Sequence, residues 1–206
     1  MKNIKLTKKD LIFGAINGLI FGSLLPVVLK SFNITEIPPY LTMVLFFTIL
    51  APIGVYIGYL LSKFKSFFFQ LVKFGATGAA NFAIDIGVLA LLVFLFYAKS
   101  SAIPNTSFII FKITSFSLAT INSYLWNKFW SFSDKDTKNI TGEFGKFVLV
   151  SLVGIIVNVS IAAIVNSLHK YTSINPKAWA AIAAMTGSIA TLTWNFLGYK
   201  LIVFKK

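Results

Sequence analysis

Six apolar runs, each close to twenty residues in length, divide this sequence and limit what it can fold into. A run of about 20 apolar residues makes a helix long enough to cross the hydrocarbon core of a bilayer. The chain of 206 residues is 57% hydrophobic and only 12% charged. The predicted fold is therefore an all-α integral membrane protein with six transmembrane helices. The runs cover residues 11–29, 40–61, 71–97, 108–127, 146–168 and 178–203.

The lysines indicate how these helices are oriented. All 19 basic residues are lysine, and the formal net charge is +13. Fourteen of them lie in the two terminal segments or in the second and fourth connections, which share one side of the membrane; five lie on the other side. Because short loops rich in basic residues stay in the cytoplasm, both termini are predicted to be cytoplasmic. No small-residue cleavage site follows the first run, so that run is expected to remain in the mature protein.

Two segments of the chain repeat. The stretch VKFGATGAANFAID (72–85) aligns with GKFVLVSLVGIIVN (145–158), and SYLWNKFWSF (123–132) aligns with NFLGYKLIVF (195–204), with a period of about 72 residues in both cases. Each repeat contains two runs, so both copies are predicted to insert the same way round, related by an axis along the membrane normal. The alignment matches Lys73 to Lys146, Phe74 to Phe147, Asp85 to Asn158, Lys128 to Lys200 and Phe132 to Phe204.

The unit KFGATGAANFAID, followed by NSYLWNKFWSF and then by a second helix pair ending WNFLGYKLIVF, resembles the GtrA-like family of small four-span membrane proteins. The resemblance covers about residues 66–206, and it departs from the family pattern at Ser123, where asparagine is usual. It implies a four-helix domain at 66–206 and an additional N-terminal helix pair at 1–65. It also implies that the protein moves polyprenyl-phosphate-linked sugars across the membrane for cell-surface polysaccharide or glycoconjugate synthesis. Related domains occur attached to polyprenyl-phosphate sugar synthases.

Such a lipid needs a cation near its phosphate, and lysines stand where one could act. Lys73, Lys128, Lys146 and Lys200 are repeat-related and lie at the predicted cytoplasmic ends of their helices. Lysine binds phosphate as a mobile point charge. The alternative is that these lysines only anchor helix ends at the interface. Lys112, which lies deeper, is a fifth candidate for phosphate binding.

Asp85 is predicted to be the one acid inside a membrane span. It lies twelve residues beyond Lys73, about 18 Å along a helix, near the middle of the bilayer. Lys112, sixteen residues before Lys128 on the next helix, lies about 24 Å from the same side, and its flexible stem can reach down to Asp85. An intramembrane Asp and Lys usually pair and mark a pathway. The alternatives are a purely structural pair and a protonated Asp85; a functional pair could couple movement to a proton gradient.

Polar side chains within the runs predict a path for the sugar. Amides in a membrane must find partners, either across helices in a structural role or along a groove that a substrate follows. The predicted path is Asn81, Asp85, Asn122, Ser123, Asn127, Asn158 and Asn195. The predicted interface aromatics are Trp126, Trp130 and Trp194.

The sequence carries no enzyme signature. His169 is the only histidine and cysteine is absent, so histidine clusters, thiolate metal sites and disulfides are excluded within one chain. Asp134 and Asp136 lie in the connection DKDTKNITGE, which is predicted to be a solvated charged loop. No cofactor, no metal and no nucleic acid partner are expected. Gly14, Gly18 and Gly22 recur at every fourth residue, which predicts close helix packing or, as an alternative, a homo-oligomer contact.

Three hypotheses for the function remain. The first is translocation of a polyprenyl-phosphate sugar in the cell membrane of a prokaryote. The second is a non-catalytic membrane anchor or regulator of a polyprenyl-phosphate glycosyltransferase, with the N-terminal helix pair as a docking or oligomerisation module. The third is an ion or small-solute transporter built around Asp85.

Overall fold

The fold is helical throughout the part of the chain that the structure describes. The structure is a computed structural model that describes residues 4–31, 34, 36–97 and 103–205, and no strand occurs among them. This confirms the predicted all-α class. The α-helices are α1 (Lys8–Ser31), α2 (Tyr40–Leu61), α3 (Phe67–Tyr97), α4 (Asn105–Trp126), α5 (Ile140–Ser167) and α6 (Pro176–Gly198). Three short helical turns follow α4, α5 and α6, respectively: η1 (Asn127–Ser131), η2 (Leu168–Tyr171) and η3 (Tyr199–Val203).

The predicted spans agree with these helices to within a few residues. By length and composition, five helices among the described residues can cross a membrane, and α6 has 23 residues. Two boundaries need correction, because α1 begins at Lys8 and not at residue 11, and α5 begins at Ile140 and not at residue 146. Asp10 is therefore inside the first helix and Glu143 is inside α5, so the prediction that Asp85 is the only acid within a span is wrong. Three lysines used in the charge count, Lys2, Lys99 and Lys206, lie outside the described residues.

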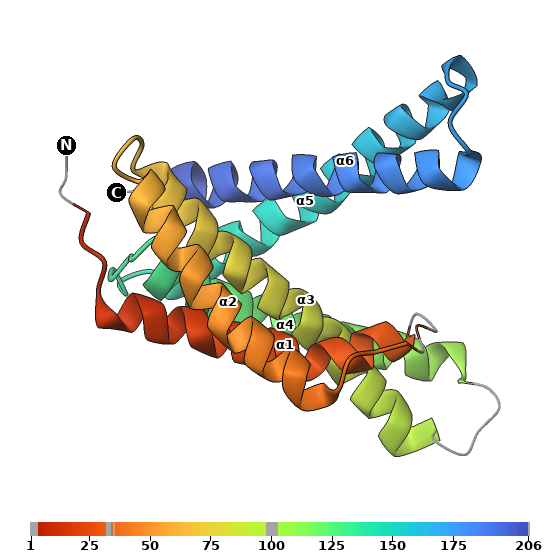
Figure 1. Cartoon of the computed structure of the whole chain (residues 1–206), viewed down its shortest axis with the longest axis horizontal. Coiled ribbons are helices and arrows are strands. Elements are labelled where there is room, and N and C mark those ends of the chain that lie inside the picture. Colours follow the sequence, from red (N-terminus) through yellow and green to blue (C-terminus); the bar gives the residue numbers. More distant parts are fainter. Residues whose placement is uncertain (1–3, 32–33, 35, 98–102, 206) are drawn as a thin grey trace. The chain divides into compact units, whose positions relative to one another are not determined.

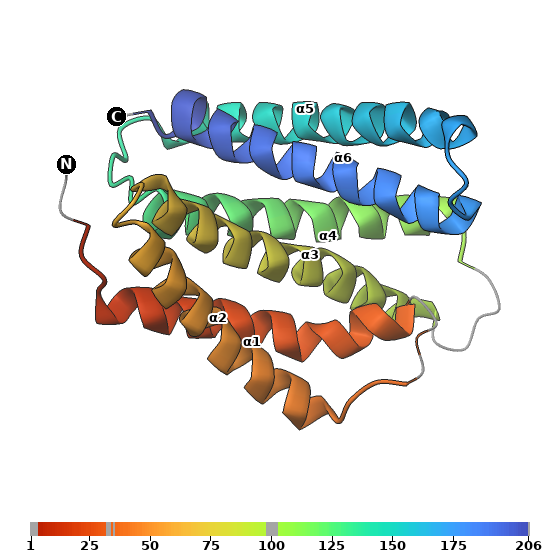
Figure 2. The same cartoon turned by 45° about the horizontal axis from the view of Figure 1, so that its top comes forward.

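The chain divides into two compact units, Met1–Asp134 (unit 1) and Lys135–Lys206 (unit 2). In unit 1, α3 packs against α1, α2 and α4, and α1 packs against α2. Figures 1 and 2 show α3 with these neighbours along its length. Unit 2 is a hairpin in which α5 and α6 pack antiparallel and are joined through η2 (Figure 2).

Glycines let α1 and α2 approach each other closely. A Cβ added at Gly18 would collide with the carbonyl oxygen of Phe47, and one added at Gly22 would lie 2.8 Å from the carbonyl oxygen of Met43. Near the contact, the rings of Phe21 and Phe47 meet edge to face, with centroids 4.7 Å apart. The prediction that the glycine stripe serves close helix packing is confirmed, and the helix it meets is α2 of the same chain.

The two repeats share matching local structure. Both end in a five-residue π-helical turn, η1 and η3, closed by equivalent hydrogen bonds: Phe132 N–H donates to Asn127 O at 2.9 Å, and Phe204 N–H donates to Tyr199 O at 2.7 Å. The alignment also pairs two ring contacts. The rings of Phe74 and Phe132 lie 6.4 Å apart, and those of Phe147 and Phe204 lie 6.3 Å apart. These matching features, one set inside each unit, support the predicted duplication of a two-helix repeat.

Ser133, which follows η1, provides a test of the turn. It is the only non-glycine residue with positive φ (51°) in the described part of the chain. That conformation suits glycine, so Ser133→Gly is expected to raise stability by about 0.5–1 kcal/mol. The measurement is the midpoint of thermal unfolding in detergent. Ser133→Ala, which keeps the Cβ but removes the 3.2 Å hydroxyl bond to Trp130 O, is the control and should not be stabilising. A loss of stability in both variants would mean that this hydroxyl bond outweighs the backbone strain.

Candidate functional site

A stripe of four polar residues runs along α3 inside unit 1. Lys73, Thr77, Asn81 and Asp85 follow one another at intervals of four residues, which places them on one face of the helix. Lys73, Thr77 and Asn81 are buried. At about 1.5 Å per residue, the stripe spans about 18 Å, more than half of a bilayer's hydrocarbon core. Buried polar groups need partners in such a place, and the partners come from α1 and α4.

The end of the stripe near the N terminus is a buried ion pair. Asp10 pairs with Lys73, and they are only 7% and 5% exposed. The indole N–H of Trp130 donates to Asp10 Oδ1 at 3.2 Å. The amide and hydroxyl of Thr7 donate to Asp10 Oδ2 at 2.9 and 2.7 Å. We call Thr7, Asp10, Lys73 and Trp130 the Asp10 cluster; its hydrogen bonds offset much of the cost of burying two charges.

The Asp10 cluster was missed from the sequence because the first span was expected to start after it. A signal for it exists: Thr7 and Asp10 have the spacing of a helix-capping box, and Asp10 N–H in turn donates to Thr7 Oγ1 at 3.2 Å. Trp130, predicted as an interface aromatic, is buried and bonded to Asp10. Its neighbour Trp126 is partly buried and contacts Phe13 edge to face, with centroids 5.3 Å apart.

A second buried ion pair closes the end of α4. Lys128 is fully buried, and its Nζ donates to Asp134 Oδ2 at 3.2 Å. The backbone makes the pair possible, because the chain turns back after η1 and Asp134 N–H donates to Lys128 O at 2.7 Å. The prediction that the connection after residue 133 is solvated is therefore wrong at Asp134, which is buried, and holds at Asp136, which is exposed.

Amides occupy the middle of the stripe. Asn122 Nδ2 of α4 donates to Asn81 Oδ1 at 2.6 Å, which is an interhelical bond of the kind predicted as the structural alternative. Asn127 instead bonds within its own chain segment, donating to Ser123 O at 2.9 Å. Thr77 Oγ1 and Asn81 Nδ2 are buried and have no hydrogen-bond partner among the described residues. The stripe therefore has unused hydrogen-bonding capacity between its two charged ends.

The far end of the stripe is the predicted pair of Asp85 and Lys112. Lys112 Nζ donates to Asp85 Oδ2 at 2.5 Å, and Ser115 Oγ donates to Asp85 Oδ1 at 2.7 Å. The pairing is thus confirmed. Unlike Lys73, the side chain of Lys112 is 42% exposed, whereas that of Asp85 is 20% exposed. A ligand can therefore reach the Lys112 ammonium from the surface of the α3–α4 pair. On the buried side, the hydroxyl of Ser115 keeps Asp85 in place.

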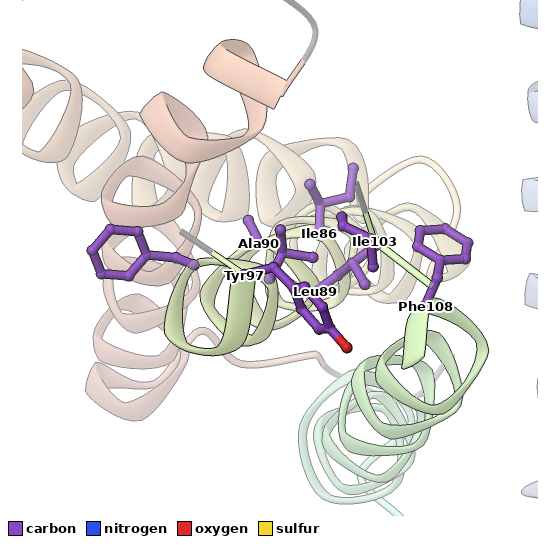
Figure 3. A pocket seen from close by; sticks show the side chains of 8 residues that line it. Ile86, Leu89, Ala90, Tyr97, Ile103 and Phe108 are labelled. Atoms are coloured by element: carbon purple, nitrogen blue, oxygen red, sulfur yellow. The ribbon is translucent and has the colours of Figure 1, made fainter. Parts of the chain in front are cut away.

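An apolar pocket lies next to this pair. It has a volume of about 600 Å³, and its walls include Ile86, Leu89, Ala90 and Tyr97 of α3 with Ile103 and Phe108 (Figure 3). Leu89 is one turn beyond Asp85 on α3, and Phe108 is one turn before Lys112 on α4. The Tyr97 hydroxyl is 2.7 Å from Ser107 Oγ, so the polar tip of the tyrosine already has a partner. A charged group that ligands can reach thus borders an apolar space.

The predicted residues of the second repeat lie in unit 2. Lys146 is exposed near the start of α5, and Lys200 is partly buried in η3, with its Nζ 5.6 Å from the ring centroid of Phe196. Asn158 and Asn195 lie against glycines of the facing helix, Gly187 and Gly154, respectively. Trp194 Nε1 donates to Val150 O at 3.0 Å. Within the described residues, no three His, Asp or Glu side chains are grouped closely enough to hold a metal ion.

The helices and the polar stripe define a multi-pass membrane protein that keeps paired charges inside its helical units. The chain belongs to the family of the GtrA/DPMS transmembrane domain, whose model matches residues 73–204. The resemblance drawn from the sequence motifs is therefore confirmed. In the ion pair of Asp10 and Lys73, Asp10 lies outside the region that the family model matches, and Lys73 is the first residue of that region.

Two curated proteins are similar to this chain. The uncharacterized membrane protein YngA of Bacillus subtilis is 25% identical over 134 residues, which are 65% of this chain and 78% of that protein. A dolichol-phosphate mannosyltransferase of Pyrococcus furiosus is 29% identical over 100 residues, which are 48% of this chain and 26% of that protein. The match therefore spans about a quarter of the length of the mannosyltransferase. No solved structure matches the chain.

Proposed function

We propose that this protein moves a polyprenyl-phosphate-linked sugar across the cytoplasmic membrane of a prokaryote. Family membership supports the class of lipid, since the similar protein of P. furiosus is by name a dolichol-phosphate mannosyltransferase. The observation that carries the proposal is the Asp85–Lys112 pair, a charged group with an accessible cation at the end of a buried polar stripe. Ionisable residues inside membrane helices are costly, and they mark substrate or ion pathways.

The chemistry of the substrate suits three parts of unit 1. The phosphate is matched by the Lys112 ammonium, which donates up to three hydrogen bonds. The hydroxyl-rich sugar is matched by the amides and hydroxyls of the stripe, among them the unpartnered Thr77 Oγ1 and Asn81 Nδ2. The isoprenoid chain is matched by the apolar pocket beside the pair and by the surrounding lipid. With both termini in the cytoplasm, as the lysines predict, the stripe runs inward from the cytoplasmic end.

In the proposed mechanism, the phosphate replaces Asp85 as the acceptor for Lys112. Asp85 then keeps its hydrogen bond from Ser115, which is made to the other carboxylate oxygen. The exchange is local, because Lys112 has a flexible stem and is already partly exposed. Return of Lys112 to Asp85 releases the phosphate on the far side.

The test is movement of a short-chain polyprenyl-phosphate sugar across liposomes that contain the purified protein. Lys112→Ala and Asp85→Asn are each expected to slow transport about 10- to 100-fold, which corresponds to loss of a charge-assisted contact of about 1.5–3 kcal/mol. Thr114→Val is the matched control: it changes an exposed residue on the same helix, whose hydroxyl bonds only to Ile110 O, and should leave the rate unchanged.

A neutral pair separates a functional role from a structural one. The double variant Asp85→Asn, Lys112→Gln keeps a hydrogen-bonding pair without charge, so it should fold like the wild type, as thermal unfolding would show. If that variant transports at the wild-type rate, the charges are structural and the mechanism is wrong. If the wild-type protein moves no lipid above empty liposomes, translocation itself is refuted.

A second candidate function follows from the same comparison. In the P. furiosus relative, the matched region is about a quarter of a named transferase. The transmembrane domain of this chain can, as a second candidate function, serve as an anchor or regulator of a polyprenyl-phosphate glycosyltransferase. Changes in the exposed part of the connection around Asp136 should then impair the partner enzyme, while Asp85→Asn should not.

A further inference from the structure

The two repeats carry lysines at equivalent positions, but the surroundings of these lysines differ. Lys73 aligns with Lys146 at the start of the first helix of each repeat, and Lys128 aligns with Lys200 in the π-helical turn. The equivalence is structural as well as sequential, because both turns have the same length and equivalent closing bonds. The four lysines can therefore be compared as pairs that share the same local backbone structure and differ in the side chains around them.

In the first repeat, both lysines are neutralised within unit 1. Lys73 pairs with Asp10 of the additional helix α1, and Lys128 pairs with Asp134 after the turn. All four side chains are buried. A phosphate could reach either lysine only by displacing a carboxylate that is held by further bonds, such as those from Thr7 and Trp130 to Asp10. The two carboxylates thus occupy the places that an anionic ligand would take.

In the second repeat, neither lysine has a carboxylate partner within the described residues of unit 2. That unit contains two acids, Asp136 and Glu143, and Asp136 is engaged by the backbone N–H of Lys138 at 2.9 Å. Lys146 is exposed, and Lys200 is only partly buried, beside the Phe196 ring. Both ammonium groups therefore keep hydrogen-bonding capacity for an anion.

An aromatic cluster fixes the backbone that carries these lysines. Phe147, the residue after Lys146, stacks on Tyr199, the residue before Lys200, with centroids 4.2 Å apart and an interplanar angle of 18°. The Tyr199 hydroxyl is 2.6 Å from Ser151 Oγ, which ties η3 to α5 again. The two lysines are thus the sequence neighbours of one aromatic contact and lie at the same end of the α5–α6 hairpin.

We propose that the phosphate of a polyprenyl-phosphate lipid binds to Lys146 and Lys200 of the second repeat, and that Asp10 and Asp134 close the equivalent position in the first. This inference rests on the proposed function for the identity of the lipid. It narrows the predicted phosphate-binding lysines at helix ends from four to two. It also assigns a role to the N-terminal helix α1, because Asp10 of this helix neutralises Lys73.

The test is binding of a fluorescent short-chain polyprenyl monophosphate to the full-length protein in phosphatidylcholine nanodiscs. Lys146→Gln and Lys200→Gln should each weaken binding about tenfold, as loss of a charge-assisted contact does. Lys146→Arg should retain most of the affinity. The matched control is a neutral double variant of the first repeat, Lys128→Gln with Asp134→Asn, which should bind like the wild type once shown to be folded. Equal weakening by changes in both repeats would overturn the proposal, as would no effect of the Lys146 and Lys200 variants.

Competition identifies the source of the phosphate. An unlabelled polyprenyl monophosphate should displace the probe, whereas inorganic phosphate and phosphatidylglycerol at the same concentration should not. Displacement by phosphatidylglycerol would show a general anchor for anionic lipid, and displacement by inorganic phosphate would show a site for the free ion; either result refutes the assignment.

Binding and transport fail in different ways. Binding that depends on Lys146 and Lys200 without transport would leave this site standing and refute translocation. Transport that is unaffected by Lys146→Gln and Lys200→Gln would leave translocation standing and refute this site.

Discussion

Asp10→Ala is expected to destabilise the protein by about 3–5 kcal/mol, the usual cost of leaving a buried charge without its partner. Lys73 is 5% exposed and has Asp10 as its carboxylate partner, while its Nζ also lies 4.0 Å from the Phe69 ring centroid. Removal of the carboxylate also leaves the Trp130 N–H without its acceptor. The measurement is unfolding of the purified protein in detergent, by heat or by a denaturing detergent.

A neutral double variant is the control for this prediction. Asp10→Asn with Lys73→Met removes both charges, keeps an acceptor for Trp130 and fills the space of the lysine stem. It should recover most of the lost stability, because replacing a buried ion pair by well-packed neutral groups is often nearly neutral. A double variant as unstable as Asp10→Ala would instead show that the helix-capping bonds with Thr7 carry the effect.

Gly18→Val is expected to have the second large effect, a destabilisation of about 3 kcal/mol or more. The obstacle to a side chain at this position is the backbone carbonyl of Phe47, with Ala51 Cβ beside it at 2.9 Å. Backbone cannot rotate away as a flexible side chain can, so α1 and α2 must separate. Thermal unfolding and the yield of monodisperse protein would both fall, with Gly18→Ala intermediate.

Gly54→Ala is the matched control for helix packing. A Cβ added at Gly54 would lie 3.9 Å from Val72 Cγ1, an ordinary contact distance, so this variant should be neutral or slightly stabilising. If Gly18→Val and Gly54→Ala behaved alike, the close approach of α1 and α2 at Phe47 would be refuted.

The sequence predicted those parts of the fold that depend on the bilayer alone. The thickness of the hydrocarbon core sets the helix length, so the apolar runs gave the helices to within a few residues. The fixed rise of a helix also allowed depth to be counted along the chain. Asp85 and Lys112 were placed at about 18 and 24 Å on adjacent helices, a difference that the lysine stem spans, and the structure contains this pair. Both inferences need only distances along the chain.

The remaining parts of the site depend on tertiary contacts that no count along the chain supplies. Asp10 and Lys73 are 63 residues apart, and only the packing of α1 on α3 brings them together. Asp134 is close to Lys128 in sequence, but its burial depends on the turn through Ser133 in an uncommon backbone conformation. Trp130 lies near a helix end, a position that is typical of an interface aromatic. Its buried hydrogen bond to Asp10 is a tertiary contact, so the position of Trp130 in the sequence could not predict it.

In the proposed mechanism, the Asp85–Lys112 pair also links transport to the membrane voltage. A closed pair has no net charge, so the electric field across the membrane exerts almost no net force on it. Moving one elementary charge through 100 mV changes the energy by about 2.3 kcal/mol. In the proposed mechanism, Lys112 turns to the phosphate and neutralises it, so Asp85 is left with one net negative charge inside the field. The closed pair therefore does not respond to the membrane potential, whereas in the proposed mechanism the pair opened by a phosphate does.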